Sequence, residues 1–197
     1  EETVLSHLTQ IFRLYGLPQR MLMDNGSPWR ATDLESVTSL EVWLMRLGVQ
    51  IQHGHPYHPQ TQGKDERFNQ TLKVEAIGNQ VFSDVRACQQ CFDTWRTVYN
   101  FERPHEALGL AVPASRYQMS VRSFPEQLPT VEYGAHDDVR IVQRHGKIYY
   151  KNREIKVGKG FCGQRVAVRP TTTDGVHEVF FCQTKVATFD LRAYTTP

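Results

Sequence analysis

Two carboxylate side chains, Asp24 and Glu66, stand where the sequence could place metal ligands. Asp24 follows the apolar run 21–23, which predicts a buried strand, and it begins a cluster of turn-forming residues. A carboxylate directly after a buried strand is exposed at the sheet edge on a rigid backbone, which suits a metal ligand. The same Asp-Asn-Gly pattern fits an Asx-turn or a helix N-cap, so Asp24 taken alone leaves both interpretations open.

Glu66 lies one turn into a predicted helix that covers residues 64–80. At about 100° per residue, Gln70 lies about 40° and Lys73 about 20° from Glu66 around the helix axis. One face of this helix therefore offers a carboxylate, an amide and an ammonium group. The opposite face carries Phe68, Leu72 and Ala76, which we expect to pack. An ordinary amphipathic helix with Glu66 in solvent would show the same periodicity.

Two carboxylates from separate elements could share a pair of Mg²⁺ or Mn²⁺ ions held roughly 3.5–4 Å apart, which activate an attacking oxygen in phosphoryl transfer and stabilise a leaving one. That chemistry normally uses at least three protein carboxylates. The acids before Asp24 are Glu1 and Glu2, at the frayed start of the chain, so the third ligand is not visible. The loop with His53, His55 and His58 lacks a fourth ligand, so we expect no zinc.

The four cysteines are too sparse for a disulfide scaffold and suit a reducing compartment. Cys88 and Cys91 form a C-x-x-C within a predicted helix and have no second close pair, which favours structural cysteines over a metal or redox site. No apolar run approaches the roughly 20 residues that span a bilayer. The first residues are acidic where a signal peptide is basic. The sequence therefore predicts a soluble, cytoplasmic protein with no membrane partner.

The first two thirds of the chain read as a mixture of helices and strands. Helices are predicted at 4–15, 35–47, 64–80 and 84–100, and strands at 21–23 and 49–52. The Pro- and Gly-containing segment 53–63 excludes regular structure.

After about residue 136 the pattern changes to the alternation of short strands. Strands are predicted at 139–143, 147–151, 153–157, 164–169, 177–183 and 185–189. Several short strands separated by turn signals favour a small barrel. The predicted organisation is an α/β domain at 1–120, an irregular linker at 121–135 and an all-β domain at 136–197.

Charge is divided unevenly along this chain of net charge +2. Residues 131–197 hold 11 Lys and Arg against 7 Asp and Glu, whereas residues 1–130 hold 12 against 14. A basic C-terminal third is compatible with a polyanion partner and equally with a solvated surface.

Three motifs in the first 120 residues resemble the catalytic core of bacterial insertion-sequence transposases, which belong to the retroviral-integrase superfamily with an Asp-Asp-Glu triad. The motifs run from Met23 to Trp29, from His55 to Phe68 and from Tyr99 to Leu108, in family order. The basic all-β segment is similar to the SH3-like barrel that follows this core in many such enzymes, although this match is weaker.

The resemblance implies an RNase H-like fold, Mg²⁺ or Mn²⁺ dependence, and DNA cleavage and joining by a polynucleotidyl transferase. Asp24 matches the second Asp of the triad, Glu66 the Glu, and Lys73 the helix lysine near the DNA end. The 41-residue gap between Asp24 and Glu66 is longer than the commonest family gap. The first Asp of the family precedes the equivalent of residue 1, so we expect a core that lacks its first three strands, a fragment that is inactive alone.

Double-stranded DNA is the expected partner, with a homo-oligomer formed on it and no small-molecule substrate. The candidate DNA contacts are Lys64, Arg67, Gln70, Lys73, Lys147, Lys151, Arg153, Lys156, Lys159 and Arg165. Tyr149, Tyr150 and Phe161 could stack on an unpaired base or fill the barrel core. Arg103 and His105 could contact phosphate or cap a helix C-terminus.

Two classes of function compete for this sequence. The first is a transposase fragment whose parent enzyme performs metal-dependent strand transfer. The second is a non-catalytic DNA-binding or assembly protein derived from such an enzyme. A protein-interaction barrel and an RNase H-type nuclease are further alternatives, and the loop at 56–63 favours the transposase branch over the nuclease.

Overall fold

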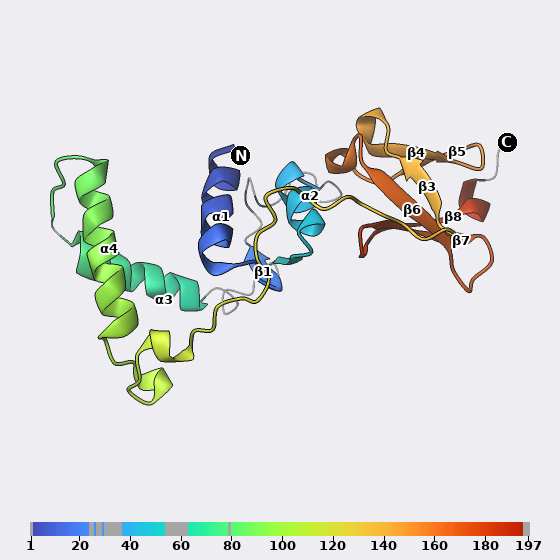
Figure 1. The fold of residues 1–197 in the computed structure, drawn as a ribbon. Coiled ribbons are helices and arrows are strands. Elements are labelled where there is room, and N and C mark those ends of the chain that lie inside the picture. Colours follow the sequence, from blue (N-terminus) through green and yellow to red (C-terminus); the bar gives the residue numbers. More distant parts are fainter. Residues whose placement is uncertain are drawn as a thin grey trace. The chain divides into compact units, whose positions relative to one another are not determined.

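The computed structural model describes residues 2–23, 26, 29, 37–53, 63–78 and 80–194 (Figure 1). The chain divides into two compact units, Glu1–Gly54 with Ser120–Pro197, and His55–Met119. Both helices and strands are present, as the α/β prediction requires. None of the helices in the described ranges is long and apolar enough to cross a membrane.

The first unit begins with two helices and a pair of parallel strands. Its elements are α1 (Glu2–Tyr15), β1 (Arg20–Met23), α2 (Ser39–Arg46) and β2 (Gln50–His53). The register of the strand pair places Met23 opposite His53. Thr38 and Glu41 form a capping box that starts α2 later than the predicted residue 35. Residues 35 and 36 lie outside the described residues.

Helix α2 is packed on two sides. Leu40 and Leu44 are fully buried in a cluster with Phe12 of α1, and Trp43 stacks on Phe12 at 5.7 Å between ring centroids. Val42, on another face of the same helix, belongs to the hydrophobic cluster of the C-terminal strands. This short helix therefore joins two cores into one unit.

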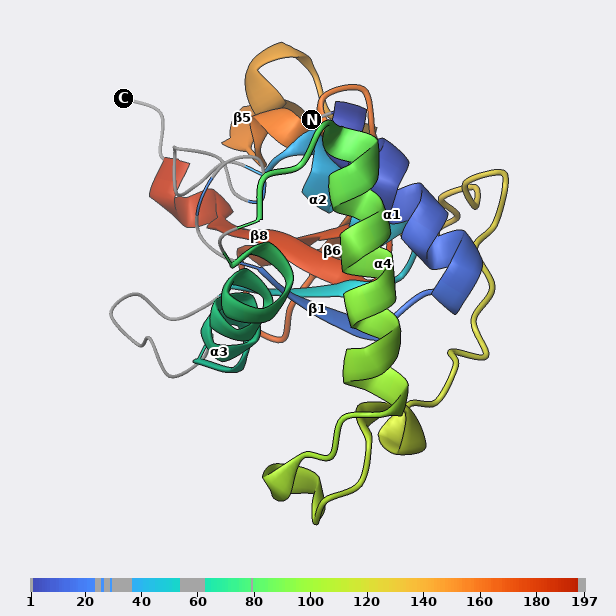
Figure 2. The same ribbon diagram turned by 90° about the vertical axis from the view of Figure 1, so that its left-hand side faces the viewer.

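The C-terminal segment forms the six predicted strands. They are β3 (Asp138–Ile141), β4 (Lys147–Tyr150), β5 (Arg153–Lys156), β6 (Arg165–Pro170), β7 (Val176–Phe181) and β8 (Thr184–Asp190). One antiparallel sheet has the order β3-β6-β7-β8, and β4 pairs with β5 in a separate hairpin (Figure 1). Figure 2 shows β6 and β8 of the sheet and β5 of the hairpin from another side. Lys151 and Asn152 both have positive φ, which gives this hairpin the two-residue turn that matches strand twist.

The segment from Ser120 to Ala135 is irregular, as predicted, but it is bound along the first unit. Arg122 donates to the carbonyl oxygens of Pro18 at 2.9 Å and Leu47 at 2.6 Å, just before β1 and β2. At the other end of the segment, the Tyr133 hydroxyl donates to the Arg165 carbonyl oxygen at 2.6 Å. Burial raises the pKa of Tyr133 to about 12.

The contact between α2 and the β-strand segment depends on Gly160, which lies in the turn η6 (Lys159–Phe161). A Cβ at this position would lie 2.0 Å from the Val37 carbonyl oxygen, just before α2. Backbone at this distance leaves no room for any side chain, so the turn and the start of α2 approach each other only with glycine at 160.

We predict that Gly160→Ala lowers the free energy of unfolding by about 1–3 kcal/mol, the usual cost of overpacking. Gly134→Ala is the matched control, because its added Cβ would meet the nearest atom at 3.5 Å, an ordinary contact. Urea denaturation of the two variants measures the difference. Equal stabilities would show that α2 and η6 can separate freely.

Candidate active site

The second unit is built on two helices, with a π-helix between them. They are α3 (Gly63–Leu72), the π-helix η2 (Lys73–Ile77) and α4 (Val85–Phe101). Asp84 caps α4 by accepting a hydrogen bond from the Ala87 backbone N–H at 2.8 Å. The continuous helix predicted for 64–80 is thus interrupted. The Gly78 N–H reaches back five residues to the Lys73 carbonyl oxygen, at 2.8 Å, and widened turns of this type are frequent at functional sites.

Glu66 lies in the first turn of α3, where its side chain is exposed. Gln70 and Lys73, on the same face, are also exposed, as are Lys64 and Arg67. None of these five side chains forms a hydrogen bond or ion pair with a described residue. A carboxylate, an amide and three cations are therefore available to an external ligand, as a site that binds metal and nucleic acid requires.

The opposite face of α3 packs on α4 through aromatic rings. Phe68 meets Trp95 and Tyr99 edge-on, with ring centroids 5.6 and 5.4 Å apart. Further along, Ala76 is buried, and its carbonyl oxygen accepts a bond from the Cys91 thiol at 3.3 Å. This packing keeps the Glu66 face directed away from α4.

Glu75 is a functional candidate that sequence reasoning missed. One carboxylate oxygen accepts a hydrogen bond from the Trp95 indole N–H at 2.9 Å, and the other accepts from the Arg103 guanidinium. The Trp95 and Arg103 donors together hold the pKa of Glu75 below its ordinary value. The Glu75 carboxylate therefore links the π-helix η2 to Trp95 in α4 and to Arg103, two residues after α4 ends.

Arg103 makes two side-chain contacts within the second unit. It pairs with Glu75, and its guanidinium lies over the Tyr99 ring at 5.7 Å. His105 packs edge-on against Tyr99 at 4.8 Å, and its Nε2 is buried without a hydrogen-bond partner in the described part of the chain. The third motif, Tyr99 to Leu108, thus contacts α3 and η2 on the side opposite Glu66, through Tyr99 and Arg103. The opposite charges of Glu75 and Arg103 are compatible with an ion pair. Because the two residues are 28 positions apart, however, the sequence does not predict that they meet.

The second expected carboxylate, Asp24, lies outside the described residues. Strand β1 ends at Met23, immediately before it, as the prediction of a strand end requires. His53 at the end of β2 bonds through Nε2 to the buried Glu41 carboxylate at 2.9 Å. His55 and His58 also lie outside the described residues.

The chemistry of Glu66 suits a hard cation, because an exposed carboxylate without a protein donor keeps its oxygen lone pairs for a metal. One carboxylate does not make a metal site. Across the described ranges, no group of three His, Cys, Asp or Glu side chains is placed to hold a metal ion. That observation leaves the predicted Asp24–Glu66 combination untested, and the metal stays a proposal. The four cysteines are free thiols.

Five of the eleven basic side chains of the β-strand segment form ion pairs with described acidic neighbours. Lys147, a candidate DNA contact, pairs with Glu154 across the β4–β5 hairpin. Other ion pairs join Arg140 to Asp138, Arg169 to Asp137, Lys185 to Glu178 and Arg192 to Asp190. The Arg169 guanidinium, bonded to both carboxylate oxygens, lowers the pKa of Asp137 to about 2. These five cations are thus already paired with carboxylates, whereas the net positive charge of the segment is unchanged by the pairing.

Of the three aromatic residues considered for base stacking, two are in the core. Tyr150 and Phe161 are buried, which agrees with the core-filling alternative. Tyr149 is 60% exposed, and its hydroxyl bonds to Glu154 at 3.2 Å. Tyr149 is the only member of the trio whose ring a nucleotide could reach.

Comparison with known families places these elements in a class. The model of the integrase core domain matches residues 47–113, which begin directly after α2 and run through β2, α3 and α4 to the segment after α4. The chain therefore carries an integrase-core segment, which confirms the predicted superfamily and fits an RNase H-like integrase fold.

The C-terminal segment shows which group of transposases the chain resembles. Residues 137–197 match the model of the IS481 family transposase, C-terminal domain. Together the two matches confirm the resemblance to insertion-sequence transposases.

Among solved structures, the chain is similar to a chain in the cryo-EM structure of the simian T-cell lymphotropic virus intasome in complex with PP2A regulatory subunit B56 gamma. The identity is 16% and the TM-score is 0.44. The similarity covers 93% of this chain and 63% of that chain, so this chain spans less than two thirds of its neighbour's length.

We predict that Glu75→Gln lowers the free energy of unfolding at pH 7 by about 1 kcal/mol, because two donors lose their charged acceptor at a partly exposed site. The folded-state pKa of Glu75 lies below the ordinary 4.5, so its contribution is complete above that pH and is lost as the pH falls. Thermal denaturation from pH 7 to pH 3 should show the two proteins converging.

Glu106→Gln provides the control, since this exposed carboxylate lies near the same helix end and has no described partner. A constant difference between Glu75→Gln and the parent at every pH would contradict the charged contact.

Proposed function

We propose that this chain is part of a DNA transposase and contributes to metal-dependent DNA cleavage and strand transfer. The observation that carries the proposal is the exposed, unpaired Glu66–Gln70–Lys73 face of α3, supported from behind by the Phe68, Trp95 and Tyr99 rings. An aromatic support fixes the helix while its polar face remains free for a ligand. The resemblance to IS481 family transposases and to the integrase core supports DNA as the substrate.

In this proposal Asp24 and Glu66 hold Mg²⁺ or Mn²⁺. When bound, the metal ions lower the barrier to phosphoryl transfer by polarising the phosphate and activating the attacking oxygen. The chain's own residues position the DNA: Lys73 and Gln70 beside Glu66 bind the strand that is cut, and Lys64 and Arg67 bind neighbouring phosphates. The attacking group is water or a DNA 3′-hydroxyl.

The 197 residues alone are proposed to be inactive. Two carboxylates fall one short of the usual set, so the proposed reaction needs a third carboxylate besides Asp24 and Glu66. A homo-oligomer on DNA would also bring several such cores together. These are consequences of the proposed reaction.

The C-terminal strands are proposed to be an SH3-like barrel that binds DNA. Support comes from the antiparallel β3-β6-β7-β8 sheet, the β4–β5 hairpin and the hydrophobic cluster that they share. The candidate contacts are Lys147, Lys151, Arg153, Lys156, Lys159 and Arg165, with Tyr149 exposed among them. The boundaries of the core at 1–120, the linker at 121–135 and the barrel at 136–197 belong to the same proposal.

A non-catalytic DNA-binding or assembly protein is the second candidate. The unpaired cations of α3 favour it as much as they favour an enzyme, because phosphate contacts need no metal. The two candidates differ in whether Glu66 is needed for a chemical step.

We predict that Glu66→Gln and Asp24→Asn each abolish strand transfer while the affinity for duplex DNA changes less than about twofold, because phosphate contacts rather than carboxylates supply affinity. The assay is Mn²⁺-supported plasmid nicking and strand transfer by this chain and by a form extended upstream. Asp65→Asn is the control, since it removes an exposed carboxylate next to Glu66 in the same helix turn.

Activity in the extended form that disappears in both variants and survives Asp65→Asn supports the enzyme. Strand transfer that survives Glu66→Gln would refute it. Duplex binding with no activity in either form would favour the non-catalytic candidate.

A further inference from the structure

Five basic side chains of the C-terminal segment form ion pairs with carboxylates, whereas Lys159 of the same segment and Arg46 of α2 form none with a described residue. The Lys159 side chain is exposed, and its ammonium group makes no hydrogen bond or ion pair with a described residue. It lines a pocket of about 390 Å³ together with Arg46 of α2. No carboxylate among the described residues lines this pocket, so within the described part of the chain its charged lining is two cations.

The remaining polar lining comes from both walls. Ser39 and Arg46 are seven residues apart in α2, so they lie on one face of the helix. Cys162 and Gln164 follow η6 on the other wall. Apart from the thiol, the pocket thus offers a hydroxyl, an amide, an ammonium and a guanidinium, a set that suits an oxyanion with several acceptor oxygens.

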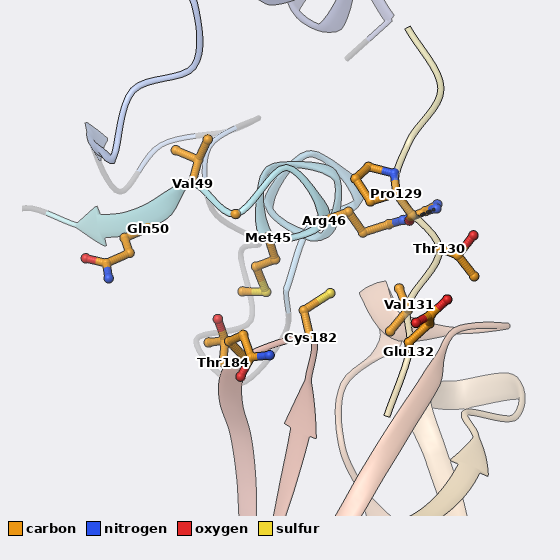
Figure 3. A pocket seen from close by; sticks show the side chains of 12 residues that line it. Met45, Arg46, Val49, Gln50, Pro129, Thr130, Val131, Glu132, Cys182 and Thr184 are labelled. Atoms are coloured by element: carbon orange, nitrogen blue, oxygen red, sulfur yellow. Dashed lines mark hydrogen bonds between the residues drawn. The ribbon is translucent and has the colours of Figure 1, made fainter. Parts of the chain in front are cut away.

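Arg46 retains unused donor capacity. One terminal nitrogen donates to the Pro129 carbonyl oxygen at 3.0 Å, and Figure 3 shows the side chain reaching from α2 toward Pro129. Nε is buried without a partner in the described part of the chain. Since Nε is inaccessible, the donors open to a ligand are on the terminal nitrogens, and only one of these two nitrogens has a hydrogen-bond partner among the described residues.

A second cavity lined by Arg46 serves as a comparison. It has a volume of about 450 Å³ and lies against Pro129, Thr130 and the turn after β7 (Figure 3). Glu132 also lines it, so the charges that line this cavity balance, unlike those of the Lys159 pocket.

We propose that the pocket between α2 and η6 binds a backbone phosphate of DNA, with Arg46 and Lys159 as the charged ligands and Ser39 and Gln164 as neutral donors. Because Gly160 holds η6 against the start of α2, one phosphate would contact the helix and the β-strand segment together. DNA would then bind across the junction of the two cores. This inference deepens the proposed function and rests on it.

The first test is the salt dependence of duplex binding, measured by fluorescence anisotropy with a duplex of arbitrary sequence. Lys159→Gln should reduce the slope of log K against log salt by about 0.9 and weaken binding about three- to tenfold near 0.1 M salt, as expected for one lost phosphate contact. Lys185→Gln is the matched control, because this exposed lysine is already paired with Glu178. Its slope should equal that of the parent chain.

The second test uses the native thiol in the pocket. Cys162 is exposed, whereas the other three cysteines are partly buried. Saturating duplex should slow alkylation of Cys162 by N-ethylmaleimide at least fivefold, followed by mass spectrometry of each cysteine, and Lys159→Gln should reduce that protection. Cys88 and Cys91 on α4 provide the internal reference.

The outcomes separate the site from the proposed function. Duplex binding with equal slopes for both lysine variants and an unprotected Cys162 would overturn the phosphate site and leave DNA binding intact. Absence of duplex binding at low salt would overturn both. Protection of Cys162 by inorganic phosphate without duplex binding would assign the pocket to a free anion and overturn the DNA source.

Discussion

A helix of eight residues, α2, must be buried on two faces at once, and much of the first unit depends on this constraint. Leu40 and Leu44 fill the cluster under α1, while Val42 fills the cluster under the C-terminal strands. Each cluster alone is small, and burial of apolar surface is the main favourable term for both. Sharing one helix removes a solvent-exposed face from each and fixes the two modules in one unit.

The same constraint accounts for the close approaches along the junction. Gly160 meets the Val37 carbonyl oxygen because η6 must come close enough for Val42 to reach the strand cluster. Arg122 satisfies the carbonyl oxygens that precede β1 and β2 and thereby holds the connecting segment on the same unit. Polar side chains that face this junction, Arg46 among them, are brought together as a consequence of apolar packing.

In the second unit, α3 and its continuation η2 pack on α4 through one face and expose polar side chains on the other. Phe68 and Glu75 on one side of α3 and η2 contact Trp95 of α4, one through its ring and the other through a hydrogen bond. The side chains of Glu66 and Lys73, on the other side, form no hydrogen bond or ion pair with a described residue. In the proposed function, which rests on the resemblance to transposases, this exposed face would bind metal through the carboxylate and DNA through the lysine.

The sequence by itself determined where the helices and strands lie and which residues share a face of a helix. The period of α3 separated Glu66 from Phe68, alternation located the six C-terminal strands, and the motifs gave the superfamily, because side-chain direction follows from local backbone geometry. Only the tertiary structure decided the partners. Glu75 and Arg103 are 28 residues apart, Lys147 is neutralised by Glu154 across a hairpin, and Lys159 shares a pocket with Arg46. Periodicity gives no register between distant segments, so whether a cation is paired or free for a ligand is settled by long-range packing.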